Sequence, residues 1–190
     1  IPYCRKQCRY CDFAIVPIGT AASSQTDDDD DDTNSSDNNR AKRLFQKMDA
    51  SYRDAIVSEI DLISKYATTV IDNTSEKSTT TTTKQNKIPL RSIYFGGGTP
   101  SLAPLDTLQS ILDAILNSPD SAFYHHPDQP MEPMEITIEM DPGTFSLSKL
   151  HALKAMGFNR ISLGVQSFDD TILESIGRVH RYRDIIDAVD

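Results

Sequence analysis

The chain has 190 residues, with 28 acidic and 19 basic side chains and a formal net charge of −9, and this length favours one domain and allows two at most. Much of the negative charge comes from Asp27 to Asp32 and from Asp37, so the rest of the chain is nearly neutral. A nucleic-acid partner, which requires clustered Lys and Arg, is therefore not expected. No apolar run reaches the roughly 18 residues that span a bilayer, so we expect no membrane-spanning segment.

All three cysteines of the chain, Cys4, Cys8 and Cys11, lie within eight residues of one another. An odd number in one tight cluster does not fit a disulfide framework, and it indicates metal or redox chemistry in a reducing compartment. Because Ile1 is not an initiator Met and a strand should precede this loop, we expect an internal fragment of a longer chain. Any targeting peptide is then expected upstream of it.

Two polar low-complexity tracts interrupt the apolar pattern. We expect residues 17–50, which contain a run of six aspartates, to be an acidic disordered insertion that does no chemistry, because this composition cannot bury apolar surface. Residues 72–87, with five consecutive threonines, are expected to be a second, Thr-rich insertion, because no apolar alternation accompanies the threonines. Between them, residues 51–71 carry an apolar stripe at spacings of three and four, which predicts a core helix. The stripe consists of Tyr52, Ile56, Ile60, Ile63 and Ala67.

Residues 88–190 predict strands that alternate with helices. The expected strands are 92–95, 135–140 and 160–166. The expected helices are 105–115, 146–156 and 169–176, with a further helix that begins near 182. This alternation predicts an α/β fold, in which crossover helices join the strands of a parallel sheet.

Two of the predicted strands carry a polar face opposite an apolar face. The polar faces consist of Glu135, Thr137 and Glu139 in one strand and of Ser162, Gly164 and Gln166 in the other. The apolar faces must pack against the helices, so the polar faces point to the inside of a barrel. A closed barrel fills its inside with branched aliphatic side chains, and polar or small residues there instead predict a cavity for a polar ligand.

The cysteine spacing, Cys4-x3-Cys8-x2-Cys11, supplies three thiolates on one short loop. Three thiolates cannot complete a tetrahedral zinc site without a fourth ligand, but they can hold three irons of a [4Fe–4S] cluster and leave the fourth iron open. The motif alone leaves open chance clustering and a zinc site that a histidine completes. The candidate histidines are His125, His126, His151 and His180.

Residues 96–100, Gly-Gly-Gly-Thr-Pro, follow a predicted strand and precede a predicted helix, which is where α/β proteins bind ligands. The turn is not a P-loop, because no Gly-Lys-Ser/Thr follows, and Ser101 replaces the third glycine of the dinucleotide fingerprint. Three glycines would let a ligand approach bare backbone, although a tight strand–helix turn would use them equally well.

Several polar residues near strand ends are candidates for ligand contacts. Glu139 could accept hydrogen bonds from ribose hydroxyls or could be a solvated carboxylate at the rim. Gln166 is an inward amide at a strand end, and Arg178 could pair with a ligand carboxylate or could lie on the surface. Lys149, Lys154 and the histidines are expected to be solvated surface residues.

Five stretches of the chain together carry a family resemblance. They are Ile-Pro-Tyr-Cys-x3-Cys-Arg-Tyr-Cys-Asp-Phe, Tyr-Phe-Gly-Gly-Gly-Thr-Pro-Ser, Glu-Met-Asp-Pro-Gly-Thr, Asn-Arg-Ile-Ser-Leu-Gly-Val-Gln-Ser-Phe-Asp-Asp and Ile-Gly-Arg-Val-His. In this order they resemble the radical S-adenosylmethionine (SAM) proteins related to oxygen-independent coproporphyrinogen III oxidase. The resemblance covers residues 1–16 and about 51–190, fails in the two polar tracts, and favours iron–sulfur over zinc.

The resemblance implies a partial (β/α)6 TIM-like radical SAM barrel that lacks its first strand and last units here. Residues 1–16 would be the cluster-binding loop and residues 88–190 the βα units. SAM would bind the open iron, and a reductant protein such as a flavodoxin or ferredoxin would drive its cleavage to methionine and a 5′-deoxyadenosyl radical. By motif position, the cluster ligands are Cys4, Cys8 and Cys11. The SAM contacts are Tyr10, Gly97, Gly98, Thr99, Glu139, Gln166 and Arg178.

Two functions within the family are candidates for this chain. The decarboxylase makes protoporphyrinogen IX by abstracting hydrogen from propionate side chains, and its motif has a further Cys where this chain has Phe13. Asp12 and Phe13 resemble instead the HemW-type haem chaperones, which keep the cluster and SAM but bind haem for delivery to recipient haemoproteins. We therefore expect a haem chaperone in the cytoplasm or in a mitochondrial or plastid matrix. The decarboxylase is the alternative, and a zinc-dependent structural module is the candidate of a different class.

Overall fold

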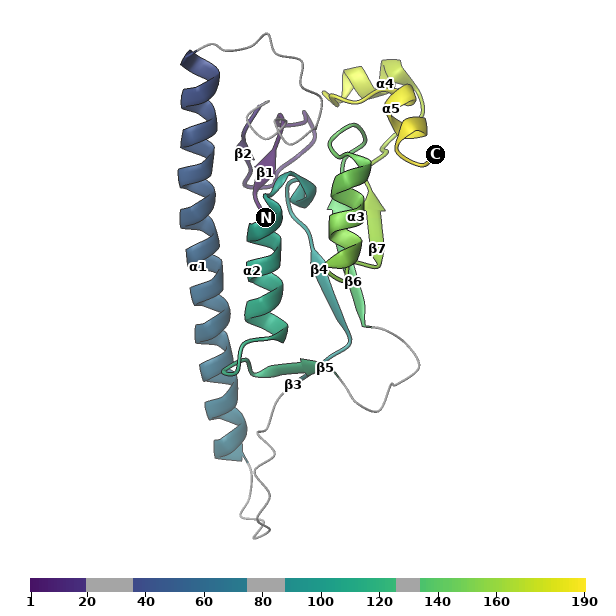
Figure 1. Cartoon of the computed structure of the whole chain (residues 1–190). Coiled ribbons are helices and arrows are strands. Elements are labelled where there is room, and N and C mark those ends of the chain that lie inside the picture. Colours follow the sequence, from purple (N-terminus) through teal and green to yellow (C-terminus); the bar gives the residue numbers. More distant parts are fainter. Residues whose placement is uncertain (20–35, 75–87, 126–133) are drawn as a thin grey trace.

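The computed structural model describes residues 1–19, 36–74, 88–125 and 134–190 (Figure 1). At the centre of this described part lies a three-stranded parallel sheet. Its strand order is β4 (Ser92–Phe95), β6 (Glu135–Met140) and β7 (Arg160–Leu163). Because the strands are parallel, their carboxyl ends meet at one edge of the sheet.

Helices connect these strands, as the alternation predicted. Helix α2 (Leu105–Leu116) lies between β4 and β6 in the chain, and α3 (Leu147–Ala155) lies between β6 and β7. Ser146 caps α3, because its hydroxyl accepts a hydrogen bond from the Lys149 backbone N–H at 3.3 Å. The apolar face of β6 packs with both helices in one hydrophobic core, which confirms the predicted orientation of this strand. The core includes Ile136, Ile138, Met140, Leu108, Ile111, Leu112 and Leu153.

The longest helix, α1 (Ser36–Thr74), differs most from the expectation. A helix was predicted over 51–71, with residues 17–50 as a disordered insertion, but the chain is helical from Ser36 onward. The apolar stripe in fact extends upstream through Met48 and Phe45, at the same spacings of three and four, and both side chains pack on the core. Their polar neighbours concealed this stripe in the sequence.

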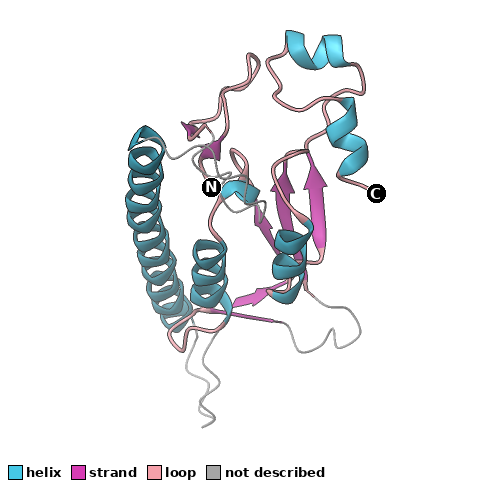
Figure 2. Cartoon of the chain, turned by 45° about the horizontal axis from the view of Figure 1, so that its top comes forward, coloured by secondary structure: helices cyan, strands magenta, loops and turns pink. Residues whose placement is uncertain are grey.

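The two polar tracts are only partly covered by the structure. The six aspartates lie within residues 20–35, which are outside the described residues, as are residues 75–87 of the Thr-rich tract. The first residues of that tract, 72–74, continue α1 and do not belong to an insertion. Helix α1 lies alongside α2 in both views (Figures 1 and 2), and a 2.7 Å ion pair between Arg53 and Asp106 joins the two helices.

Two short parallel strand pairs were not predicted. Strand β1 (Tyr3–Cys4) pairs with β2 (Val16–Pro17), and β3 (Ile88–Leu90) pairs with β5 (Phe123–His125). These strands have two or three residues each, which is too short for an alternating pattern to stand out in a sequence.

Strand β7 ends earlier than predicted, at Leu163 and not at residue 166. The backbone N–H of Val165 donates to the Leu163 carbonyl, and the next turn includes Gln166, whose φ is +63°. These local bonds replace the sheet ladder, so Gln166 lies in a loop. Ile161 is 49% exposed, so the predicted burial of the apolar face does not extend to this residue.

The last predicted helices are confirmed to within a residue or two. Helix α4 (Asp170–Ser175) is capped by Asp169, whose carboxylate accepts hydrogen bonds from two backbone N–H groups at 2.7 and 3.2 Å. Helix α5 (Tyr182–Asp187) follows it, and a 3-10 turn, η2 (Pro100–Leu102), follows β4. None of the helices in the described ranges is long and apolar enough to cross a membrane.

Candidate cofactor site

A cavity of about 290 Å³ lies at the carboxyl edge of the central sheet. Residues from five parts of the chain line it: the cysteine loop (residues 4–11), the glycine turn after β4, the end of β6, the end of β7 with the loop that follows it, and the segment after the helix at residues 170–175. All ten residues predicted to hold the cluster or SAM are among them. These are Cys4, Cys8, Cys11, Tyr10, Gly97, Gly98, Thr99, Glu139, Gln166 and Arg178.

The glycine turn packs against the first residues of the chain. Gly98 N–H donates to the Ile1 carbonyl at 2.9 Å, and Thr99 N–H donates to the Tyr3 carbonyl at 2.5 Å. A Cβ on Gly98 would lie 2.5 Å from the Tyr3 oxygen and 3.0 Å from the Cys4 sulfur. The backbone that was expected to approach a ligand therefore approaches the cysteine loop, and this contact is what requires a glycine at position 98.

The three cysteines are free thiols, each half-buried, and all face the cavity. Burial raises the pKa of the Cys4 thiol, and the Thr99 hydroxyl, 3.6 Å from its sulfur, opposes this effect. The Arg178 Nη1 atom lies 3.6 Å from the Cys8 sulfur. Because a metal binds the thiolate form, these two hydrogen-bonding groups suit sulfurs that carry negative charge.

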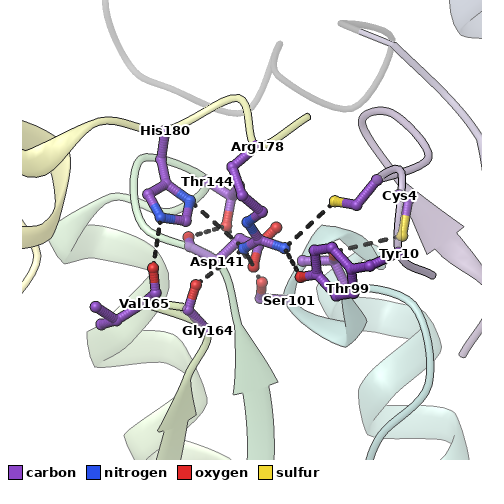
Figure 3. A network of polar contacts seen from close by, with 11 residues as sticks. Cys4, Tyr10, Thr99, Ser101, Asp141, Thr144, Gly164, Val165, Arg178 and His180 are labelled. Carbon is purple, nitrogen blue, oxygen red and sulfur yellow. Dashed lines mark hydrogen bonds and ion pairs between the residues drawn. The ribbon is translucent and has the colours of Figure 1, made fainter. Parts of the chain in front are cut away.

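The donor set fits an iron–sulfur cluster, because three thiols face one cavity and other polar residues line its remaining walls. Among the described residues, no three His, Cys, Asp or Glu side chains are arranged to hold a single metal ion. His180 belongs to the polar network of the site (Figure 3), but its Nε2 lies 3.0 Å from the Val165 carbonyl and its Nδ1 lies 3.4 Å from Arg178. Both ring nitrogens are therefore already engaged, and His180 is not poised as a zinc ligand.

Glu139 stands at the end of β6, half-buried in the cavity wall. One carboxylate oxygen accepts from Gly97 N–H at 3.0 Å, and the other accepts from the Tyr94 hydroxyl at 2.7 Å. This hydrogen bond raises the pKa of Tyr94. Because each carboxylate oxygen has two lone pairs, both can accept a further hydrogen bond from a ligand hydroxyl.

Arg178 is not a surface arginine, since its side chain is 8% exposed. It forms an ion pair with Asp141, donates to the Gly164 carbonyl at 2.9 Å, and lies 3.4 Å from the Tyr10 hydroxyl (Figure 3). Asp141 was missed in the sequence analysis, where it stands in one of the five family stretches but was given no role in the site. Its position directly after a predicted strand, at the edge of the sheet where the other candidates lie, could have indicated that it belongs to the site.

Of the residues expected on the surface, His180 is buried and Lys149 is half-buried. His180 is 4% exposed. Its Nε2 carries the proton and donates to the Val165 carbonyl, because a carbonyl can only accept a hydrogen bond. Its Nδ1 therefore accepts from Arg178. Burial lowers the pKa of His180, and the Arg178 charge adds to this shift. Lys149 donates to the Ala103 carbonyl at 3.1 Å, and burial lowers its pKa to about 8. Both corrections arise from packing between segments that are distant in the sequence.

The structure also places the other residues for which a position was predicted. Lys154 and His151 are exposed, as predicted, whereas His126 lies outside the described residues. Gln166 reaches the cavity from a loop and not from the strand end. Tyr10 is half-exposed at the cavity.

A parallel α/β sheet with a three-cysteine loop and a polar cavity at its carboxyl edge defines a cofactor-binding domain of the α/β-barrel class. Comparison with protein families agrees with this class: the Radical SAM superfamily matches residues 77–190. The chain belongs to the radical SAM superfamily, which confirms the resemblance found in the sequence. Membership implies an iron–sulfur cluster and SAM as its cofactors.

Curated relatives show where in the superfamily the similarity lies. The chain is 34% identical over its whole length to the heme chaperone HemW of Synechocystis sp., of which it covers 34%. It is 40% identical over 53% of its length to the mitochondrial radical S-adenosyl methionine domain-containing protein 1 of Bos taurus, of which it covers 21%. It is 33% identical over 71% of its length to the oxygen-independent coproporphyrinogen III oxidase of Bradyrhizobium diazoefficiens, of which it covers 27%. The chain thus spans about a third or less of these relatives.

A solved structure shows the same fold. The coproporphyrinogen III oxidase HemN of Escherichia coli, described as a radical SAM enzyme, superposes with a TM-score of 0.62 over 98% of this chain and 31% of that one. The sequence identity is 22%, so this likeness concerns the fold alone. It confirms the predicted partial TIM-like barrel.

Proposed function

We propose that this chain is the cofactor-binding part of a HemW-like haem chaperone that holds a [4Fe–4S] cluster and SAM. The observation that carries the proposal is the convergence of ten predicted residues, from five separate segments, on one cavity. Residues that are scattered over some 175 positions would not line one cavity by local structure alone.

Cys4, Cys8 and Cys11 would bind three irons of the cluster. When bound, the cluster supplies the electron for reductive cleavage of SAM. The chain's own residues would stabilise the thiolates: the Thr99 hydroxyl faces the Cys4 sulfur, and the Arg178 guanidinium faces the Cys8 sulfur.

The opposite wall of the cavity would bind SAM. Glu139, held in place by Gly97 and Tyr94, would accept hydrogen bonds from the ribose hydroxyls. Gln166 and Arg178 would contact the carboxylate of SAM. The ion pair with Asp141 would hold the Arg178 guanidinium in place at the cavity wall.

The chaperone is favoured over the decarboxylase by Phe13. Its ring lines the cavity and is 65% exposed, at the position where the decarboxylase motif has a further Cys. An exposed aromatic ring beside the cofactor site suits the apolar face of a haem macrocycle. Haem, a flavodoxin- or ferredoxin-like reductant and recipient haemoproteins are the proposed partners, in the cytoplasm or in a mitochondrial or plastid matrix. Three relatives are named as mitochondrial.

The cofactor part of the proposal is tested by anaerobic reconstitution of the full-length protein. We expect stoichiometric iron and sulfide and a broad thiolate-to-iron absorption band, which is lost when any one of the three cysteines is replaced by Ala. Glu139→Ala should weaken SAM binding by about tenfold, because it removes a hydrogen-bonding carboxylate. Glu135→Ala, on the same face of β6 but outside the cavity, is the matched control and should leave SAM affinity unchanged. Stoichiometric zinc without sulfide would contradict the proposal.

The haem part needs a separate experiment. The reconstituted, reduced protein is given SAM and coproporphyrinogen III without oxygen, and a second sample is titrated with haem. We expect saturable haem binding and no protoporphyrinogen. Many turnovers of protoporphyrinogen without haem binding would instead identify a decarboxylase.

A further inference from the structure

Tyr3, the residue before the first cysteine, is anchored in the core by its side chain. It is 1% exposed, and its ring makes edge-to-face contacts with Phe45 and Tyr52 of α1, at centroid distances of 5.2 and 5.7 Å. Its hydroxyl donates to the Asp49 carboxylate at 2.9 Å. The start of the cysteine loop is therefore tied to α1, in the segment that the sequence suggested was disordered.

Asp49 is a buried carboxylate with two hydroxyl donors. It is 4% exposed, and its second oxygen accepts from the Thr107 hydroxyl of α2 at 2.6 Å. Burying a carboxylate is costly unless hydrogen bonds compensate, and bonds from hydroxyls to an ionised acceptor are stronger than bonds between neutral groups. The two bonds therefore hold Asp49 firmly between Tyr3 and α2.

The backbone of Tyr3 is held in place as well as its ring. Its carbonyl accepts from Thr99 N–H at 2.5 Å, and Gly98 packs so close that a Cβ there would meet this oxygen. Cys4 follows directly, with its sulfur 3.6 Å from the Thr99 hydroxyl. A continuous chain of contacts thus runs from Asp49 through Tyr3 to the sulfur of Cys4.

We infer that Asp49 is a positioning residue, which acts through Tyr3 to place Cys4 at the cofactor site. Edge-to-face packing alone leaves the Tyr3 ring free to slide along its long axis, whereas a hydrogen bond from its tip sets that position. Any slide of the ring moves the adjoining Cys4. The inference rests on the proposed role of Cys4 as a cluster ligand.

The test compares two variants that each remove one hydroxyl donor to Asp49, Tyr3→Phe and Thr107→Val, in the full-length protein. Both hydroxyls are buried, so both variants should lose a similar amount of stability to urea. Only Tyr3 adjoins Cys4, so Thr107→Val is the matched control. Asp49→Asn, which replaces one acceptor oxygen by a donor, should behave like Tyr3→Phe.

Two measurements separate positioning from general stability. In the apo protein, the alkylation rate of Cys4 is followed by mass spectrometry, with Cys11 as internal reference. Tyr3→Phe and Asp49→Asn should increase the Cys4 rate by about tenfold, the population change that follows the loss of one hydrogen bond to a charged group. In the reconstituted protein, the same two variants should change the EPR spectrum of the reduced cluster, and Thr107→Val should not.

The outcomes distinguish this inference from the proposed function. Equal changes in Tyr3→Phe and Thr107→Val, or no change in either, would overturn the positioning role. If the wild type takes up no iron and sulfide while Cys4 alkylation responds as expected, the proposed function is wrong and the contact between Asp49 and Cys4 through Tyr3 stands.

Discussion

Arg178 links separate segments of the chain through one guanidinium group. Nη1 faces the cysteine loop at Cys8 and Tyr10, and Nη2 contacts Asp141 after β6 and the Gly164 carbonyl after β7. These contacts use the planar fork of arginine, so a lysine at this position would keep the charge but could not reach all of them. One buried residue thus connects the proposed cluster ligands to the carboxyl edge of the sheet.

His180, packed against this guanidinium, should make stability depend on pH. Burial lowers its pKa and the Arg178 charge adds to the shift, while the carboxylates of Asp141 and Asp184 oppose it. In the unfolded chain this histidine therefore binds a proton near pH 6.5, whereas in the folded protein it binds the proton only at a lower pH. The free energy of unfolding should fall as the pH drops below about 6.5, until the folded-state pKa is reached, whereas above about pH 7 this group contributes no pH dependence.

Urea denaturation between about pH 5 and 7 measures this effect. His180→Gln, which has no titrating side chain, should flatten the decline over this range. His151→Gln, on the exposed side of α3, is the matched control and should leave the profile as in the wild type. An unaltered decline in the His180 variant would assign the pH dependence to other groups.

At the scale of elements, the N-terminal part of α1 is a structural component of the site. Phe45 and Asp49 project from this part onto Tyr3, and Tyr52 continues the same helix face one turn later. The helix thus covers the start of the cysteine loop with a face that alternates between aromatic and carboxylate groups.

This packing predicts unequal costs for two adjacent substitutions in α1. Phe45 is 8% exposed and Leu44 is 68% exposed. Phe45→Ala should lower the free energy of unfolding by about 3–5 kcal/mol, because it opens a cavity beside Tyr3. Leu44→Ala should change it by no more than about 0.5 kcal/mol. Urea denaturation of both variants measures the difference, and equal costs would show that this part of the helix does not pack on Tyr3.

At the scale of the whole molecule, the cysteine loop is held on two sides. The first residues pair with the glycine turn, and at the other side Arg9 caps the end of α4: its backbone N–H donates to the Ile176 carbonyl at 3.0 Å, and its side chain donates to Ser175 O at 3.0 Å. The positive side chain suits the negative end of the helix. The loop therefore depends on one segment from the middle of the chain and on another near its carboxyl end.

Gly98→Ala tests this dependence. Its Cβ would overlap the Tyr3 carbonyl, so we expect a loss of about 1–3 kcal/mol in stability and a lower iron content after reconstitution, because the first residues must shift. Gly157→Ala is the control. Because φ at this position is +100°, the substitution should lower the stability by about 1–2 kcal/mol, but the new Cβ faces Ile136, away from the loop. Its iron content should stay at the wild-type level. Equal iron contents in the two variants would contradict the role of the Gly98 contact.

The sequence by itself determined the features that depend on neighbouring residues. Alternation over 92–95 and 135–140 specified β4 and β6, and Ser146 marked the start of α3, because a strand face and a helix cap are set by residues a few positions apart. The cysteine spacing and the glycine turn likewise indicated the candidate site, because each of these motifs consists of residues that are close together in the chain.

Only the tertiary structure decided which polar residues are buried and what they contact. Tyr3 and Asp49 are 46 positions apart, and Asp141 and Arg178 are 37 positions apart, so no pattern within a local window reports either pair. The same holds for Phe45, whose burial depends on Tyr3 packing against α1. Burial of a polar group is stable only when a partner compensates it, and that partner is supplied by the folded arrangement of distant segments.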